Sequence, residues 1–145
     1  MVVALCVSGC AFVDHEIVLQ PQTNIAQSTV GSSVRLFVRF VDERADQNIG
    51  NRAAGNQGAR ISARNLPSVT EAQLRDGLAR KGYQIVTTEQ GADAVAVYRL
   101  RGFSFSTDIG FFTGGQNQNA VLAVDASRTG RTFTKVYRYE RSSVL

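Results

Sequence analysis

Hydrophobic and polar residues alternate with a period of two in several stretches, which is the pattern of half-buried β-strands. The clearest stretch is residues 33–42, SVRLFVRFVD, in which Val34, Leu36, Val38 and Phe40 fall on one face. Further strands are expected at residues 83–87, 94–106, 120–127 and 132–141. The last two flank Arg-Thr-Gly-Arg, a connection of hairpin length.

One segment has helical spacing instead. Leu74 and Leu78 lie four residues apart within a stretch that is otherwise mostly polar, so they form a narrow apolar stripe. The pattern predicts a helix that Ser68 caps, with Glu71 reaching back to complete a capping box. Gly82 is expected to end this helix in the left-handed conformation.

The remaining segments are polar and rich in turn formers. Residues 11–33 favour a tether with a short strand at 16–19, and residues 43–67 favour a long loop with a short strand at 59–63. Gly102 is expected to mark a bulge or bend in the long strand. The sequence FFTGGQNQN, residues 111–119, is expected to be a loop.

These elements predict an α+β fold: a mostly antiparallel sheet of about five strands, with one amphipathic helix packed on one face. A chain of 145 residues suits one domain, which we expect at residues 33–145. One helix covers five strands poorly. Either the other face of the sheet is polar, or a covering element follows Leu145 and the domain is truncated there.

The N-terminus carries a candidate lipidation site. An apolar run at residues 1–7, far short of the roughly 20 residues that span a bilayer, ends in Val7, Ser8, Gly9 and Cys10. This V-S-G-C sequence resembles the bacterial lipobox, in which the cysteine thiol receives a diacylglyceryl group and the chain is cut before the cysteine. In the alternative interpretation, Cys10 is a small buried hydrophobic residue at the start of a strand.

The lipobox interpretation divides the chain. Residues 1–9 are then the remnant of a signal peptide whose start lies upstream, and residues 10–32 are a lipidated tether. Cys10 carries diacylglycerol and an N-acyl chain, which anchor the protein in a membrane. Cys6 is discarded, so no thiol is left for a disulfide or metal. Ala11 stands where an Asp would favour the inner membrane, so we expect the outer membrane, facing the periplasm.

Charge and chemistry exclude most other functions. The net charge is +4, but the basic residues are spread along the chain, without the clustering or motif of a nucleic-acid site. His15 is the single histidine and lies in the tether, where we expect a solvated side chain. No catalytic, cofactor or metal site is expected. The candidate carboxylates show no spacing that would mark a catalytic pair. They are Asp42, Glu43, Asp93, Asp108, Asp125 and Glu140.

Several short motifs together resemble one family. They are the lipobox, a strand running into Asp42-x-Arg44, then Ile49-Gly50, LARKGY ending at Tyr83, and AVAVYRL followed by a hairpin. In this combination the chain resembles the YajG-type lipoproteins of Gram-negative bacteria, in which a further C-terminal helix is usual. The resemblance implies an outer-membrane-anchored periplasmic domain without catalytic residues. We expect Asp42 and Arg44 to act in structure, with the arginine paired to the aspartate.

The function that follows is a non-enzymatic binding or accessory role in the cell envelope, with a protein or peptidoglycan as partner. The sequence does not determine the oligomeric state. Candidate contacts are the exposed sheet edge and the apolar loop pair Phe111 and Phe112. In the alternative interpretation, these two phenylalanines pack at the end of the hydrophobic core. One alternative is a protein that acts on or binds cell-wall glycan. A less favoured alternative is a cytosolic basic domain that binds RNA.

Overall fold

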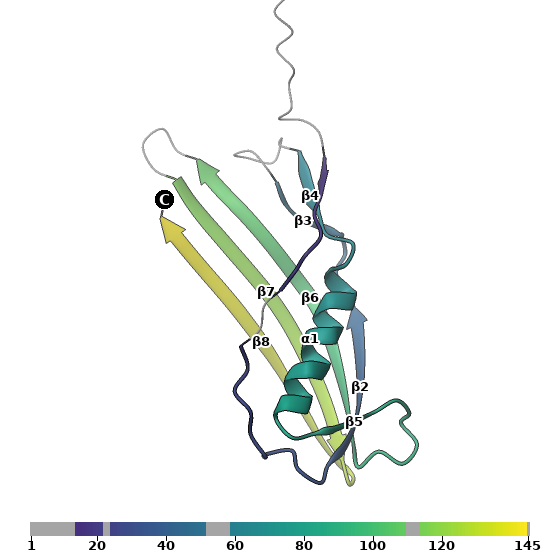
Figure 1. Cartoon of the computed structure of the whole chain (residues 1–145). Coiled ribbons are helices and arrows are strands. Elements are labelled where there is room, and N and C mark those ends of the chain that lie inside the picture. The colour runs from purple at the N-terminus through teal and green to yellow at the C-terminus, as the bar shows by residue number, and fades with distance from the viewer. Residues whose placement is uncertain (1–13, 22–23, 52–58, 110–113, 145) are drawn as a thin grey trace, which may run out of the picture.

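The computed structural model describes residues 14–21, 24–51, 59–109 and 114–144, which form one sheet and one helix (Figure 1). In chain order the elements are β1 (His15–Glu16), β2 (Arg35–Asp42), β3 (Asn48–Asn51), β4 (Arg60–Ser62), α1 (Leu66–Arg80), β5 (Gln84–Val86), β6 (Ala94–Ile109), β7 (Gly114–Arg128) and β8 (Arg131–Val144).

Among the described residues the sheet is mixed and has eight strands with a single helix, so the expected α+β fold with a mostly antiparallel sheet of about five strands is wrong. β6 lies at its centre and pairs antiparallel with β7 along its whole length, and β7 pairs antiparallel with β8. On its other edge, β6 pairs in parallel with β2 and then with β3. Four of the seven pairings among the described strands are parallel. The physical reason is that α1 lies in the crossover between β2 and β5, and such a crossover brings strands together in parallel.

The register aligns distant parts of the chain in one row across the sheet. This row contains His15, Ile61, Gly50, Phe105, Gln118 and Arg141. The beginning of the described chain and the last residues of β8 therefore lie at the same end of the sheet, as Figure 1 also shows. The β7–β8 turn lies at the opposite end.

Helix α1 covers only part of the sheet. It lies against β2 and β5, and the core beneath it contains Leu36, Val38 and Ala96, with Leu78 of the helix packed against them. A second core cluster, which includes Ile49 and Leu100, lies toward the other end. The amphipathic stripe of the helix was thus predicted correctly, and it faces the parallel half of the sheet.

The two ends of α1 differ in how well the sequence anticipates them. At the C-terminal end, Gly82 has φ of 92° and its N–H bonds to Ala79, while the N–H of Tyr83 bonds to Leu78, as in a Schellman motif. This confirms the predicted stop. At the N-terminal end, the predicted Ser68 cap is wrong, because the helix begins at Leu66 with Asn65 as its N-cap.

The side chain of Asn65 makes no capping hydrogen bond to the helix and instead ties the N-terminal segment to it. Its Oδ1 accepts from the N–H of Leu19 at 3.0 Å, and its Nδ2 donates to the carbonyl of Leu19 at 2.9 Å. Further along, a side chain at Gly77 would meet Ile25, and one at Gly31 would meet the ring of Tyr83. The described part of residues 14–32 therefore follows the length of α1 and packs on the domain.

Two local predictions about the long strands are confirmed. The register between β6 and β7 shifts between Leu100 and Gly102, which is the expected bulge. Thr129 and Gly130, with φ of 51° and 75°, form the expected turn between β7 and β8. The expected loop at residues 111–119 is partly wrong, because β7 already begins at Gly114.

Candidate functional site

Strand β8 is the most exposed long element of the domain. Four of its large hydrophobic side chains are exposed: Phe133 by 54%, Val136 by 41%, Tyr137 by 48% and Tyr139 by 52%. The side chains of Phe133, Tyr137 and Tyr139 lie on the face that carries α1, because they pair with Ala126, Leu122 and Ala120, which border the core clusters or a cavity on that face. The helix does not extend over them.

The backbone of β8 is also free along one edge. Within the described residues, β8 pairs only with β7. Arg128 and Arg131 close the two-residue turn, so every second residue from Thr132 onward directs its N–H and C=O away from β7. Such a row of unpaired groups is a template for adding a strand. We call the exposed side chains and free backbone of β8 the β8 surface.

The β8 surface is basic. Arg131, Lys135, Arg138 and Arg141 alternate with the aromatic residues, and Glu140 is the one acidic residue of the strand. The ammonium of Lys135 lies 4.8 Å from the ring centroid of Tyr137, which is a cation–π distance. Charged residues on an edge strand oppose indiscriminate pairing, so this surface selects against partners that are themselves basic.

An apolar cavity of about 410 Å³ lies at the end of the sheet where the described chain begins. It is lined by residues of β3, β4, β6, β7 and β8 and by the segment after β1: Ile17, Ile49, Ile61, Phe103, Ser104, Phe105, Gln118, Asn119, Ala120 and Tyr139. We call it the apolar cavity. Its wall depends on Gly50, where β3 meets β6, because a Cβ there would come within 2.2 Å of the carbonyl oxygen of Phe105. A second cavity of about 310 Å³ lies at the other end, between α1 and the start of β8.

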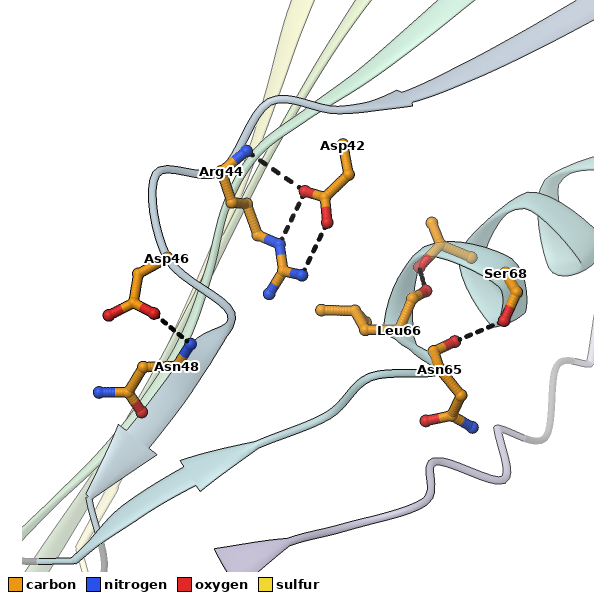
Figure 2. Close-up of polar contacts among 8 residues, drawn as sticks. Asp42, Arg44, Asp46, Asn48, Asn65, Leu66 and Ser68 are labelled. Atoms are coloured by element: carbon orange, nitrogen blue, oxygen red, sulfur yellow. Dashed lines mark hydrogen bonds and ion pairs between the residues drawn. The ribbon is translucent and has the colours of Figure 1, made fainter. Parts of the chain in front are cut away.

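Asp42, the last residue of β2, and Arg44 form an ion pair in which the arginine side chain is buried and the aspartate is partly exposed (Figure 2). Both guanidinium contacts to the carboxylate measure 2.8 Å, and the Arg44 N–H also donates to Asp42. The Arg44 side chain is only 4% exposed. The hydrogen bond from Arg44 lowers the pKa of the Asp42 carboxyl. The expected pairing is confirmed, and it fixes the chain where it turns from β2 toward β3.

The remaining candidate carboxylates lie in ion pairs or outside the described side chains. Glu43 and Asp125 both contact Arg99, on the face of the sheet opposite α1, and Asp93 pairs with Arg35. The pKa of Asp125 is lowered by hydrogen bonds from Thr134 and then from Arg99, and that of Asp93 by Arg35. Glu140 is exposed on β8, and the side chain of Asp108 lies outside the described ones.

Several predicted site residues cannot be placed. Val7, Ser8, Gly9, Cys10, Phe111 and Phe112 lie outside the described residues. His15 is exposed on β1, as expected for a solvated histidine. Among the described residues, no three His, Cys, Asp or Glu side chains are grouped to hold a metal ion. No helix in the described ranges is long and apolar enough to cross a bilayer.

Sequence patterns did not reveal the apolar cavity. Its walls come partly from Ile17, Ile49 and Ile61, which stand singly in polar segments. The signal that was available is that each isoleucine lies in or next to a short strand: β1, β3 and β4. Because these strands have only two to four residues, their alternation is too short to recognise.

Comparison with known proteins identifies the family. A family model described as "Uncharacterized lipoprotein" (Lipoprotein_16) matches residues 21–144. The chain belongs to this lipoprotein family. The expected likeness to lipoproteins of uncharacterised function is therefore confirmed at the family level, and it covers nearly the whole described domain. No curated protein matches the chain.

Two solved structures align with this lipoprotein at low sequence identity. Protein XCC0632 from Xanthomonas campestris, assigned to family-model DUF330, aligns with a TM-score of 0.58 at 13% identity, over 88% of this chain and 78% of that one. Lipoprotein GNA1162 from Neisseria meningitidis aligns with a TM-score of 0.44 at 14% identity, over 76% of this chain and 84% of that one. At such identities the first likeness shows the fold alone.

Proposed function

We propose that this lipoprotein is a YajG-type domain, anchored through lipid on Cys10 to the outer membrane and facing the periplasm, where it binds an envelope partner without catalysis. Membership of a lipoprotein family supports the anchor. The V-S-G-C sequence supplies a cysteine in the expected place. Cys10 precedes His15 by five residues, so the bilayer lies within about 18 Å of β1 along an extended chain.

The observation that carries the binding role is the β8 surface. A strand of 14 residues exposes one backbone edge and four large hydrophobic side chains. Soluble domains usually cover or blunt such an edge, because it invites pairing with other chains. An extended segment of an envelope protein could add to this edge by backbone hydrogen bonds and place alternate side chains against the aromatic residues.

Attachment to the membrane supports a role in which the domain binds its partner with low affinity. A membrane-held domain meets partners in the same membrane at high effective concentration, so a modest affinity suffices for capture. The chemistry of the carboxylates supports binding over glycan cleavage. A glycosidase needs a general acid whose pKa is raised, whereas the shifted carboxyls Asp42, Asp93 and Asp125 all have a lowered pKa.

The proposal is tested by cross-linking in living cells. The complete lipidated protein carries a photoreactive residue at Tyr137, and the adducts are identified by mass spectrometry. We expect one dominant protein adduct. The control places the same residue at Asp76, an exposed position on α1, where that adduct should be absent. Adducts to peptidoglycan alone would make the partner a glycan, and the absence of any adduct would contradict binding through β8.

Intact mass spectrometry of the membrane fraction tests the anchor separately. We expect a chain that begins at Cys10 and carries the mass of diacylglycerol and an N-acyl group. An unmodified soluble chain would overturn the anchor and favour the cytosolic alternative.

A further inference from the structure

The apolar cavity lies at the end of the sheet from which the chain leads back to Cys10. Ile61 in its wall pairs with His15 in the register of β4 and β1, and Ile17 lines the cavity two residues later. Seven residues separate Cys10 from Ile17, a span of about 25 Å at most. Whatever is attached to Cys10 is thus held close to the cavity by the covalent chain.

The chemistry of the wall selects an apolar occupant. Its lining consists largely of isoleucine, phenylalanine, alanine and the ring of Tyr139, and its polar members are the uncharged Ser104, Gln118 and Asn119. No charged side chain lines it, so an anionic headgroup would find no partner there. A volume of about 410 Å³ falls within the range of small-molecule sites. A single long alkyl chain matches both the polarity and the size.

We propose that the apolar cavity takes up one acyl chain of the protein's own lipid anchor. This inference rests on the proposed lipidation of Cys10. The covalent link favours the anchor over free lipids, because it turns entry into an intramolecular step with a high effective concentration. A bilayer lipid, in contrast, has to leave its neighbours without such a link.

Uptake of one chain changes how the protein is held. Membrane affinity grows with the number of buried acyl groups, and a protein with fewer chains in the bilayer is bound more weakly. The domain with an occupied cavity therefore lies close to the bilayer surface and is more readily released than the domain with an empty one. The cavity in this way regulates the strength of the anchor.

The test is a cross-link within the lipidated full-length protein. A photoreactive residue replaces Ile61, the purified protein is irradiated, and its peptides are analysed by mass spectrometry. We expect fragmentation of the product to place the link between residue 61 and an acyl group on Cys10, because a link to the neighbouring His15 or Ile17 would form with or without lipid in the cavity. The same residue at Phe133, which lines the second cavity, is the position control and should give no such product.

Two substitutions, each of which fills one of the two cavities, serve as matched variants. Ala120→Phe places a ring in the apolar cavity and should lower the cross-link yield about tenfold or more. Ala126→Phe places the same ring in the second cavity and should leave the yield unchanged. Thermal melting of both variants shows whether they fold, and a variant that does not fold is replaced by leucine at the same position.

The outcomes separate the inference from the function on which it rests. A lipidated Cys10 with residue 61 joined to no acyl group of Cys10, and linked only to free phospholipid or to polypeptide atoms such as those of His15 or Ile17, overturns the inference and leaves the anchor standing. An unlipidated Cys10 in the intact mass overturns both. Equal yields from Ala120→Phe and the unsubstituted chain would show that the acyl chain lies outside the cavity.

Discussion

One row across the sheet contains Val38 of β2, Ala96 of β6, Ala126 of β7 and Phe133 of β8. All four side chains point to the face that carries α1, yet Val38 is 1% exposed and Phe133 is 54% exposed. The difference lies in the second layer, because α1 lies over β2 and does not reach β8. The covered half of the sheet therefore supplies stability, and the β8 surface supplies accessible area for contact.

The largest expected effect is in the covered half. Leu36→Ala removes a side chain that is 6% exposed beneath α1, and it should lower the free energy of unfolding by about 2 to 5 kcal/mol. Chemical denaturation monitored by circular dichroism measures this loss. A loss below about 1 kcal/mol would mean that α1 does not seal this part of the core.

The next effect concerns the ion pair at the end of β2, in which the Arg44 side chain is buried. Asp42→Asn leaves the 4% exposed Arg44 guanidinium without its counter-charge, and it should destabilise the domain by about 2 to 4 kcal/mol. Asp76→Asn, in an exposed pair with Arg80 on α1, is the matched control and should cost no more than about 0.5 kcal/mol.

The same pair predicts a pH dependence. Because Arg44 lowers the pKa of Asp42 in the folded state, its stabilisation is complete above the unfolded value of about 3.9 and is lost as the pH falls through the lower folded value. Denaturation curves between pH 7 and pH 2.5 should therefore fall less steeply in Asp42→Asn than in the unsubstituted protein. Parallel curves would contradict the pairing.

A smaller effect is expected where α1 ends. Gly82 has φ of 92°, so Gly82→Ala places a side chain in a left-handed conformation and should cost about 1 to 2 kcal/mol. Gly102→Ala is a control at a glycine without positive φ, where the nearest contact of an added Cβ is an ordinary 3.6 Å. Thermal melting compares the two, and equal costs would rule out conformational strain as the cause.

The smallest effect on stability is expected in the β8 surface. Tyr137→Ser removes an exposed ring and should change the free energy of unfolding by no more than about 0.5 kcal/mol. The same variant, with the photoreactive residue at Thr134, should lose most of the partner adduct. A large loss of stability would show that Tyr137 belongs to the core. The β8 surface would then not differ from the half of the sheet that α1 covers.

The sequence predicts the regular, local parts of this fold well. The strand at residues 33–42, the helix stop at Gly82, the bulge at Gly102 and the β7–β8 turn each follow from a few neighbouring residues. The direction of strand pairing depends on partners far apart in the chain, and for that reason the mostly antiparallel sheet was wrong. The predicted N-cap at Ser68 was wrong because the helix begins earlier, at Leu66, after an asparagine whose side chain bonds to Leu19, 46 residues away, and makes no local capping bond.

The candidate site could be predicted only where it depends on a single strand. The alternation in residues 132–141 indicates a strand with aromatic residues on one face, but its exposure depends on the reach of α1. β7 begins at Gly114 although Gly, Gln and Asn disfavour strands, because β6 and β8 hold it on both edges. The apolar cavity joins single isoleucines from three short strands, which no local pattern brings together.

The row that aligns His15 with Arg141 also serves as a reference for how far each part of the domain would lie from a bilayer. In the proposed arrangement, with the anchor at Cys10, this row lies at the membrane-facing end of the domain, and the β7 residues from Gln118 onward carry the turn at Gly130 about 40 Å farther out. Under the proposed anchor, the β8 surface then rises away from the membrane. A partner that binds near Arg141 must itself reach close to the lipid headgroups, whereas one that binds near Phe133 can be wholly periplasmic.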